Sequence, residues 1–463
     1  MNSINLFSEF TYTERRKTLK RKVGSGVIVL LGNEESSINF KDNWYSFRQD
    51  STFLYYFGLS ISGLTAVIDI DRDEEIIFGD EMSIEDVIWT GALPTLHSLA
   101  ERVGVRKVSR KSQIKEVVAA SSRLHLLPPY RPEHEIKLAA WTGLPVDQLA
   151  RKISPALIEA VVAQRAVKSD EEVEEIQKAV TISAQMHLQV MKAARAGMRE
   201  SDLVGEAYKV VASAGVPLAF PIILTTQGQI LHNHYHGHVL TEGNLVLCDG
   251  GAESPKGYAG DLTRTFPAGQ KFSERQKEIY QVVLNAHERV IACLRPGVLF
   301  RDMHLLACRD LVEGLKSLGL MKGDSDEAVN AGAHTMFFQC GLGHMMGLDV
   351  HDMESLGEEY VGYRPGVEKS KEFGLKSLRL GKELKPGNVL TVEPGIYFIP
   401  ELIDKRRADK TLNQFVNFDL LDTYKDFGGI RVEDDFLITE NGANSLGEAL
   451  PRSISEIEAV RQL

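Results

Sequence analysis

The segments Leu245-Val-Leu-Cys-Asp-Gly-Gly251 and Gly260-Asp-Leu-Thr-Arg-Thr-Phe266 both have the residue pattern of a short β-strand. Side chains alternate between the two faces of a strand, so Asp261 shares a face with Thr263, and Asp249 shares one with the leucines of its own segment. The residues between the two segments are rich in turn formers. We therefore predict a hairpin that brings the two aspartates close together.

Three more candidate metal ligands follow, each in a short strand-like or glycine-rich segment. Glu393 ends the apolar run in Val389-Leu-Thr-Val-Glu-Pro-Gly395, Glu433 lies in Gly428-Gly-Ile-Arg-Val-Glu-Asp-Asp435, and His344 lies in the glycine-rich segment Gly341-Leu-Gly-His-Met-Met-Gly347. The predicted set of four carboxylates and one imidazole is Asp249, Asp261, His344, Glu393 and Glu433.

Each carboxylate also has an ordinary structural explanation. Asp249 precedes two glycines and suits a hairpin turn, and Asp261 could form an ion pair with Arg264. Glu393 could be an exposed residue at a strand end. Glu433 could belong to a cross-strand ion pair, since Arg431 lies on the same strand face. Each of these explanations is reasonable for one residue taken alone.

Convergence of the whole set would demand cations. Four carboxylates in one pocket repel one another by roughly 4 kcal/mol per pair at about 4 Å, even with an effective dielectric constant of about 20. Four carboxylates and one imidazole provide too much ligation for one ion but suit two. Because the set contains no thiolate, Mn, Co, Fe or Zn fits it better than a structural zinc of the cysteine type.

Composition and charge are those of an ordinary globular protein. The 463 residues favour two domains, and 43% of them are hydrophobic and 25% charged. The net charge of −11 disfavours nucleic acid or an anionic membrane as a partner. The N-terminal segment has basic residues without a following apolar stretch, and the four cysteines have no C-x-x-C spacing. We therefore expect a cytoplasmic protein with reduced thiols.

Two parts of the chain differ in pattern. Short strand-like runs alternate with helical stretches at first, which predicts a smaller mixed α/β domain over residues 1–165. Ser169 and Glu172 then form a capping box that begins a long helix, and we expect a second domain over residues 166–463. The strand-like runs of the first part are 26–31, 66–69 and 75–78.

The second part contains two similar halves. Another capped helix begins after Ser273, and each half reads as helix, turn centred on Gly197 or Gly297, helix and strand-like segments. Identical pairs at an offset of 100 residues are His187/His287, Val190/Val290, Arg195/Arg295, Gly197/Gly297, Asp202/Asp302 and Ala207/Ala307. We predict an internal duplication with one site between the two halves.

These motifs resemble those of the proline-specific metallopeptidases of the pita-bread fold, the aminopeptidase P and prolidase family. The resemblance covers nearly the whole chain and implies an α/β (α+β) fold, in which an aminopeptidase P-type N-terminal domain precedes a pita-bread catalytic domain with pseudo-twofold symmetry. The matching segments are Arg48-Gln-Asp-Ser-Thr-Phe-Leu-Tyr-Tyr-Phe-Gly58, Gly257-Tyr-Ala-Gly-Asp-Leu-Thr-Arg-Thr-Phe266, Gly341-Leu-Gly-His-Met-Met-Gly-Leu-Asp-Val-His-Asp352, Thr391-Val-Glu-Pro-Gly395 and Ile430-Arg-Val-Glu-Asp434.

The resemblance implies a role for each predicted ligand. Asp249 would bind one metal ion, and His344 and Glu393 would bind the other. Asp261 and Glu433 would bridge the two ions. Such a pair of ions lowers the pKa of a shared water from about 15.7 towards about 7, and Glu393 would accept the proton of that water as general base.

Further pocket residues follow from the same resemblance. His351 and His232 match active-site histidines of the family, and Arg431 matches an arginine that orients a metal-binding carboxylate. We expect Thr263 to support the ligands in the same way. Cys340 departs from the family, which commonly has a histidine four residues before the metal histidine. A thiol cannot replace an imidazolium as a donor, so we expect either a lost substrate contact or a cysteine that packs as a small hydrophobe.

A competing metal motif is the segment His232-Asn-His-Tyr-His-Gly-His238, whose four histidines share one strand face and resemble a cupin-like mononuclear site. The glycine and carboxylate spacing around it does not fit such a site. We therefore assign His232 to the pocket and interpret the others as loop or strand histidines, of which at least one could approach the substrate.

The expected function is a dinuclear metalloexopeptidase that releases the N-terminal residue before proline, as an Xaa-Pro aminopeptidase or an Xaa-Pro dipeptidase. We expect two divalent ions, with Mn favoured over Co or Zn. The expected partners are small peptides with proline after the first residue, no nucleic acid, no membrane, and further copies of the chain in a homodimer or homotetramer. Two alternatives stay open: a binding protein or hydrolase of altered specificity because of Cys340, and a metal-free hydrolase of the creatinase kind.

Overall fold

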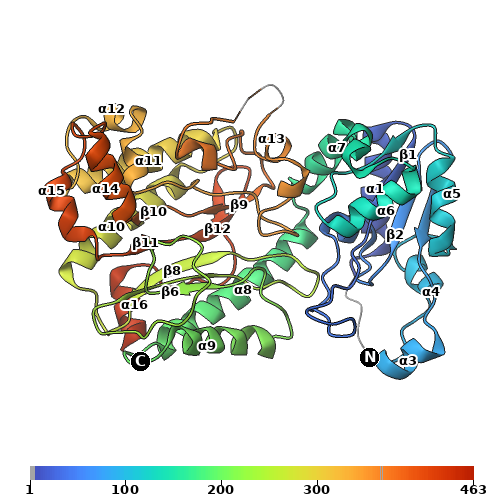
Figure 1. The fold of residues 1–463 in the computed structure, drawn as a ribbon, viewed down its shortest axis with the longest axis horizontal. Helices are drawn as coiled ribbons and strands as arrows, with labels where there is room; N and C mark the ends of the chain where they lie inside the picture. Colours follow the sequence, from blue (N-terminus) through green and yellow to red (C-terminus); the bar gives the residue numbers. More distant parts are fainter. Residues whose placement is uncertain (1–5, 365–366, 368, 463) are drawn as a thin grey trace. The chain divides into compact units, whose positions relative to one another are not determined.

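The computed structural model describes residues 6–364, 367 and 369–462 and separates into two compact units (Figure 1). The first unit contains residues 1–165 together with 353–360, and the second contains 166–352 and 361–463. The outer ends of the two predicted domains, residues 1–5 and 463, lie outside the described residues. The segment 353–360 contains the 3₁₀ helix η4 (Glu354–Leu356) and most of α13 (Glu358–Val361).

A five-stranded sheet of order β4-β3-β2-β1-β5 forms the centre of the first unit. β1 (Val27–Leu31), β2 (Thr65–Asp69) and β3 (Glu74–Phe78) are antiparallel neighbours, which confirms the three predicted strands to within one residue at each end. The edge strands β4 (Lys107–Ser109) and β5 (Leu124–His125) pair in parallel. The helices of this unit are α1 (Glu9–Val23), α2 (Ser51–Phe57), α3 (Ile84–Thr90), α4 (Leu96–Glu101), η1 (Lys111–Gln113), α5 (Ile114–Ala119), α6 (Pro132–Thr142), η2 (Val146–Lys152) and α7 (Pro155–Arg165).

The second unit is built from two helix pairs and short antiparallel strands. The long helices α8 (Asp170–Ala193) and α9 (Glu200–Ser213) pack together, as do α10 (Glu274–Cys293) and α11 (Phe300–Ser317). The shorter helices are α12 (Ser325–Asn330), η3 (Ala333–Met336), η5 (Leu375–Ser377), α14 (Pro400–Asp409), α15 (Phe418–Leu421), η6 (Asp422–Tyr424) and α16 (Ile454–Arg461). The strands are β6 (Ile223–Thr225), β7 (Leu245–Gly250), β8 (Leu262–Pro267), β9 (Val389–Val392), β10 (Gly395–Tyr397), β11 (Gly429–Arg431), β12 (Asp434–Ile438) and β13 (Ala443–Ser445).

The two helix pairs repeat each other at the predicted offset. Gly197 and Gly297 lie in the turns between the paired helices, with φ of 92° and 86°, values that favour glycine. The N–H of Gly197 donates to the Leu240 carbonyl over 2.8 Å, and the N–H of Gly297 donates to the Leu384 carbonyl over 2.9 Å. Each turn is thus fastened to a later segment in the same way, as expected of a duplicated fold.

The predicted hairpin is present and joins the two halves. β7 and β8 are antiparallel, and Asp249 lies opposite Thr263 on the same face. On its other side Thr263 forms an isolated antiparallel bridge with Glu433, whose N–H donates to the Thr263 carbonyl over 3.1 Å. Residues of the first half therefore lie directly beside residues of the second.

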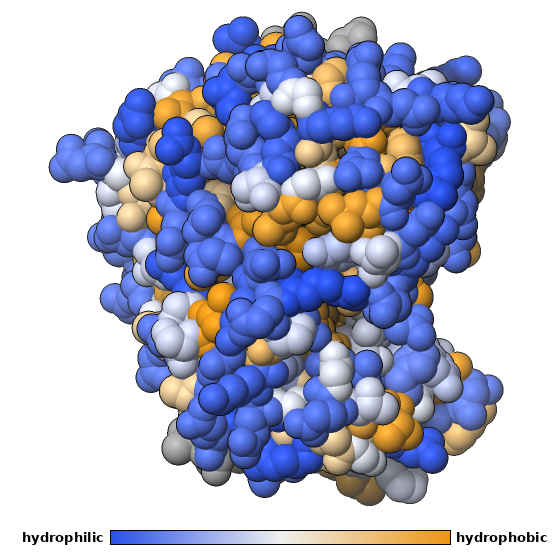
Figure 2. Space-filling model, turned by 90° about the vertical axis from the view of Figure 1, so that its left-hand side faces the viewer, coloured by the Kyte–Doolittle hydropathy of each residue, from blue (hydrophilic) through white to orange (hydrophobic). Residues whose placement is uncertain are grey.

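One face of the second unit shows how hydrophilic and hydrophobic side chains are distributed on its surface. The face of the second unit near α14 and α15 is mostly hydrophilic, and hydrophobic side chains appear on it mainly in a recess near the middle (Figure 2). Among the described residues, none of the helices combines the length and apolar character needed to cross a bilayer.

Candidate functional site

A pocket of about 300 Å³ in the second unit contains all five predicted ligands. Asp249 lies near the end of β7, and Asp261 directly precedes β8. Glu393 follows β9, and Glu433 lies between β11 and β12. The predicted residues that line the pocket are Asp249, Asp261, His344, Glu393, Glu433, His232, His351, Arg431 and Cys340.

The imidazole of His344 lies between two of the carboxylates. Its Nε2 is 3.4 Å from Oδ2 of Asp261 and 3.7 Å from Oε1 of Glu393. One ligand atom each of Asp261, His344 and Glu433 lie within 4.8 Å of one another. Such spacing would allow a metal ion to contact several of these atoms at once.

Backbone contacts with β9 fix His344 in this position. The N–H of Thr391 donates to the His344 carbonyl over 3.1 Å, and the His344 N–H donates to Oγ1 of Thr391 over 3.2 Å. Gly343 allows this close approach, because a Cβ atom there would lie 2.1 Å from the Thr391 carbonyl oxygen. His344 Nδ1 lies 3.1 Å from the carbonyl of Met345, which leaves Nε2 free to face the carboxylates.

A continuous chain of hydrogen bonds that begins at Arg431 in the pocket wall supports the carboxylates. The guanidinium of Arg431 donates to Asp249 through Nη2, to the Tyr397 hydroxyl through Nη1 over 2.9 Å, and to Thr263 through Nε over 3.2 Å. The Thr263 hydroxyl in turn donates to Oε2 of Glu433 over 2.6 Å. Arg431 and Thr263 therefore lie where groups that orient metal ligands are expected.

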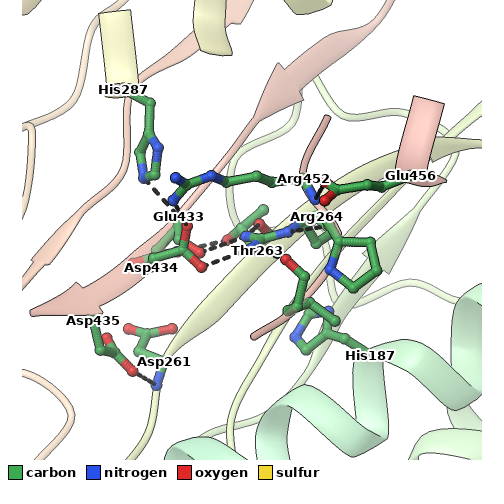
Figure 3. A network of polar contacts seen from close by, with 12 residues as sticks. His187, Asp261, Thr263, Arg264, His287, Glu433, Asp434, Asp435, Arg452 and Glu456 are labelled. Atoms are coloured by element: carbon green, nitrogen blue, oxygen red, sulfur yellow. Dashed lines mark hydrogen bonds and ion pairs between the residues drawn. The ribbon is translucent and has the colours of Figure 1, made fainter. Parts of the chain in front are cut away.

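Arg264 is not the partner of Asp261, so that simpler explanation of the aspartate is wrong. Its Nη2 donates to Oδ1 of Asp434 over 2.6 Å, and its Nη1 donates to the carbonyl of Glu433 over 2.8 Å (Figure 3). The backbone N–H of Asp261 donates to Oδ2 of Asp435 over 2.9 Å. Oδ1 of Asp261 is buried and has no hydrogen-bond partner.

Burial dominates the electrostatics of the pocket. It raises the pKa of Asp261 well above the ordinary value, and the negative charges of Asp249, Asp435 and Glu393 add to the rise. It likewise raises the pKa of Glu433, with Asp261 and Glu393 adding to the effect. Burial also raises the pKa of Glu393, although His344 and Arg431 oppose it. The ionised cluster is therefore unfavourable without added positive charge.

The donor set fits divalent cations. The unpartnered Oδ1 of Asp261 would gain a partner, and the carboxylates that raise each other's pKa would be neutralised. Carboxylate oxygens with one imidazole suit Mn²⁺, Co²⁺, Fe²⁺ or Zn²⁺. Asp249, Asp261, His344, Glu393 and Glu433 are the residues that could hold such ions.

The histidine-rich segment contributes two side chains to the pocket rather than a site of its own. His232 and His234 line the pocket. His236 Nδ1 lies 3.0 Å from the Leu224 carbonyl, and His238 Nδ1 lies 3.0 Å from Oε2 of Glu200. The cupin-like arrangement is thus absent from this segment, all of which the structure describes. Burial, followed by the positive charge of Arg431, lowers the pKa of His232, which favours its neutral form.

His351 and Cys340 complete the polar lining. The rings of His351 and His344 have centroids 4.0 Å apart. Burial and the nearby charge of Glu393 raise the pKa of Cys340 to about 12, so its thiol is neutral at ordinary pH. Cys340 therefore faces the pocket with a weak, uncharged donor.

Several neighbours of the site were not predicted from the sequence. Tyr397 accepts a hydrogen bond from Arg431, and Asp435 accepts one from the Asp261 backbone. The motif around Asp435 could have drawn attention to a second acidic residue, whereas nothing local distinguishes Tyr397. The apolar side of the pocket consists of Phe220, Pro221, Ile223, Leu231 and Val350.

A duplicated fold with a buried pocket of carboxylates and an imidazole is typical of metal-dependent hydrolases. Comparison with family models agrees: residues 174–440 match metallopeptidase family M24, and residues 12–125 match the aminopeptidase P N-terminal domain. The chain belongs to metallopeptidase family M24. Its predicted membership in the aminopeptidase P and prolidase group, and the predicted fold class, are confirmed.

Sequence similarity to individual relatives extends over nearly the entire chain. The Xaa-Pro dipeptidase of Homo sapiens is 33% identical over 458 residues, which covers 96% of this chain and 90% of the relative. A probable Xaa-Pro aminopeptidase of Fusarium vanettenii is 31% identical and covers 94% and 92%.

Solved structures show the same fold from end to end. Pseudomonas aeruginosa aminopeptidase PepP is 27% identical with a TM-score of 0.81, and 98% of each chain is covered. Zn-substituted Escherichia coli aminopeptidase P in complex with product is 28% identical with a TM-score of 0.81, and 99% of each chain is covered.

Proposed function

We propose that this protein is a dinuclear metalloexopeptidase that releases the N-terminal residue before proline. The observation that supports it most is the convergence of four carboxylates and one imidazole in a single buried pocket. In this proposal Asp249 would be a ligand of one ion and His344 and Glu393 would be ligands of the other, with Asp261 and Glu433 available to both. The family membership of the chain supports the same assignment.

Each protein group then has a defined task. When bound, the two ions would polarise the scissile carbonyl and make a water molecule acidic enough to react at neutral pH. Glu393 accepts the proton of the attacking water and passes it towards the leaving nitrogen. Its buried position and raised pKa suit a carboxylate that must hold a proton for part of the cycle.

Histidines at the pocket wall position the peptide. His351, whose ring lies beside that of His344, would donate to the carbonyl oxygen as negative charge develops there. His232 lies in the same wall and can contact the substrate backbone. Arg431 and Thr263 act indirectly, because they hold Asp249 and Glu433 in place.

The apolar side of the pocket suits a proline ring. Proline has no N–H at the scissile bond, so recognition must rest on ring shape and on the free amino end of the peptide. Phe220, Pro221, Ile223, Leu231 and Val350 provide an apolar surface for such a ring.

An Xaa-Pro aminopeptidase is the first choice and an Xaa-Pro dipeptidase the second. The N-terminal domain match and the end-to-end likeness to aminopeptidase P structures support the first. The 33% identity with a dipeptidase over nearly the whole chain supports the second. Weakened catalysis remains the alternative on account of Cys340, which faces the pocket with a neutral thiol.

We propose Mn²⁺ as the working metal, with Co²⁺ and Zn²⁺ as substitutes, because the donors are mainly carboxylate oxygens. We propose residues 1–165 as the N-terminal domain, residues 166–463 as the catalytic domain, and a homodimer or homotetramer as the working assembly.

Metal analysis combined with a peptide panel tests the function. We expect about two ions per chain in this pocket and hydrolysis of Xaa-Pro-Xaa peptides, both lost in Asp261→Asn. Asp69→Asn changes a buried aspartate of β2 in the other unit and should leave both unchanged. Hydrolysis of Xaa-Pro dipeptides only would favour the dipeptidase, and full activity without metal would refute the proposal.

A further inference from the structure

A second group of metal-binding side chains lies in the interior of the second unit, apart from the carboxylates. His304 and Cys308 are one turn apart on α11, and His334 belongs to η3. Sγ of Cys308 is 3.5 Å from Nε2 of His304, and one ligand atom from each of the three residues lies within 4.8 Å of the others. None of the three lines the carboxylate pocket.

These side chains are buried with polar atoms that lack partners. His304 is 1% exposed, Cys308 0% and His334 3%. Nδ1 of His304 has no hydrogen-bond partner, and neither nitrogen of His334 makes a hydrogen bond beyond a loose contact with the Val329 carbonyl. Buried polar atoms in native proteins nearly always have a partner, so the nitrogens of His334, beside the pair formed by Cys308 Sγ and His304 Nε2, indicate a missing ligand.

A bound proton is not the missing partner of these imidazoles. Burial lowers the pKa of His304 to about 3 and that of His334 to about 4, so both imidazoles are neutral with lone pairs available. Burial raises the pKa of Cys308, and the nearby thiol of Cys340 adds to the rise. Neutral imidazoles are the form that binds metals, and a bound cation is what stabilises a buried thiolate.

We propose that His304, Cys308 and His334 form a second metal site that binds Zn²⁺ or another borderline cation such as Co²⁺. Zinc lies about 2.0–2.1 Å from imidazole nitrogen and about 2.3 Å from thiolate sulfur, so tetrahedral ligands are about 3.6 Å apart. The 3.5 Å between Cys308 and His304 already meets this requirement. Binding would transfer the thiol proton of Cys308 to solvent.

The donor set distinguishes this site from the carboxylate pocket. A thiolate and two imidazoles select softer ions, whereas four carboxylates accept Mn²⁺ well. Cys340, which lines the carboxylate pocket, contributes to the raised pKa of Cys308, whereas His304, Cys308 and His334 do not line that pocket.

Cobalt substitution tests the proposal with a readout independent of activity. Metal-depleted full-length protein is loaded with Co²⁺, and the near-ultraviolet band of thiolate-to-cobalt charge transfer is recorded. The five carboxylate-pocket ligands contain no sulfur, so we expect the band to disappear in Cys308→Ser and His334→Gln. It should persist in Asp261→Asn and in Cys293→Ser, a control cysteine on α10.

Variants at Cys340 and Cys308 show which of the two cysteines gives the thiolate band. We expect the band to survive in Cys340→Ser, and peptidase activity to survive in Cys308→Ser. Loss of the band in Cys340→Ser together with its persistence in Cys308→Ser would overturn the proposal, because the cobalt would then report the carboxylate pocket. If a variant fails to fold, X-ray absorption of the unmodified zinc-loaded protein decides, since absence of sulfur at about 2.3 Å from zinc would also overturn it.

Discussion

The guanidinium of Arg431 donates directly to the carboxylate of Asp249, and both side chains are buried. Four strands meet at this guanidinium, because Arg431 of β11 donates not only to Asp249 of β7 but also to Tyr397 of β10 and Thr263 of β8. Burial alone would lower the pKa of Arg431, but Tyr397, Asp249 and the other acidic groups raise it well above the ordinary value. Arg431 is therefore a permanent positive charge that balances part of the carboxylate cluster.

Replacing Arg431 should weaken both the fold and metal binding. Arg431→Met leaves Asp249 buried without its cation, and breaking a buried ion pair costs about 3–5 kcal/mol. We expect metal affinity to fall by about 10–100-fold, as for other groups that orient ligands. Denaturant unfolding of metal-depleted protein and metal titration measure the two effects.

Arg431→Lys provides the comparison for that experiment. Lysine keeps the charge but lacks the planar fork that reaches Asp249, Tyr397 and Thr263 together. Its stability loss should be smaller than that of the methionine variant. Equal losses in the two variants would mean that charge balance is not what Arg431 contributes.

Thr263→Val tests the support of Glu433 without changing side-chain volume greatly. The hydroxyl donates to Glu433 over 2.6 Å and accepts from Arg431, so its removal takes one hydrogen bond from each of these two side chains. We expect metal affinity to fall about 10-fold and the fold to persist. Thr265→Val is the matched control on the same strand, because its hydroxyl donates to the Arg431 carbonyl and accepts from the Arg431 N–H, both of them backbone groups. Similar metal affinities in both variants would argue against a role for Thr263.

Local pattern was sufficient to predict much of this structure. The strands of the first unit and the β7–β8 hairpin each lie within a short run whose alternation is visible by itself. Alternation also placed Asp249, Asp261 and Thr263 on compatible faces, since the period of a strand is two. Resemblance to family motifs then linked these segments to Glu393 and Glu433.

Contacts between distant segments could not be predicted in this way. Arg264 has Asp434 and the carbonyls of Leu450 and Pro451 as partners, none of which its own segment reveals. His304 and Cys308 have the spacing of one helical turn, yet His334 joins them only through the packing of η3 against α11. Such pairings depend on tertiary packing rather than on local periodicity.

Metal binding and pH should be coupled through Asp261 and Glu433. Their pKa values are higher in the folded, metal-free protein than in the unfolded chain. Between the two values of pH, the folded protein therefore holds protons that the unfolded chain has lost. This stabilising contribution is complete below the ordinary carboxyl pKa of about 4 and is lost as pH rises through the raised values. Metal ions need the ionised carboxylates, so apparent metal affinity should rise by up to about tenfold per pH unit for each proton displaced.

Thermal unfolding at several pH values checks this coupling. Chelator-treated protein should lose stability as the pH rises above about 4, whereas metal-loaded protein should gain stability relative to it. In Asp261→Asn, the stability difference between metal-loaded and metal-free protein should depend less on pH. Parallel profiles for metal-free and metal-loaded protein would contradict the expected proton displacement.

Cys340→His should raise turnover on an Xaa-Pro-Xaa substrate. Cys340 faces the pocket with a thiol whose pKa is raised to about 12, so at neutral pH it is a weak neutral donor. An imidazole at this position could donate to the substrate. Because a positioned hydrogen-bond donor stabilises the transition state, we expect kcat/KM to increase by about 10-fold or more. Cys340→Ser has similar size without the imidazole and should leave turnover near that of the unmodified protein. Equal turnover in the histidine and serine variants would show that Cys340 does not limit activity.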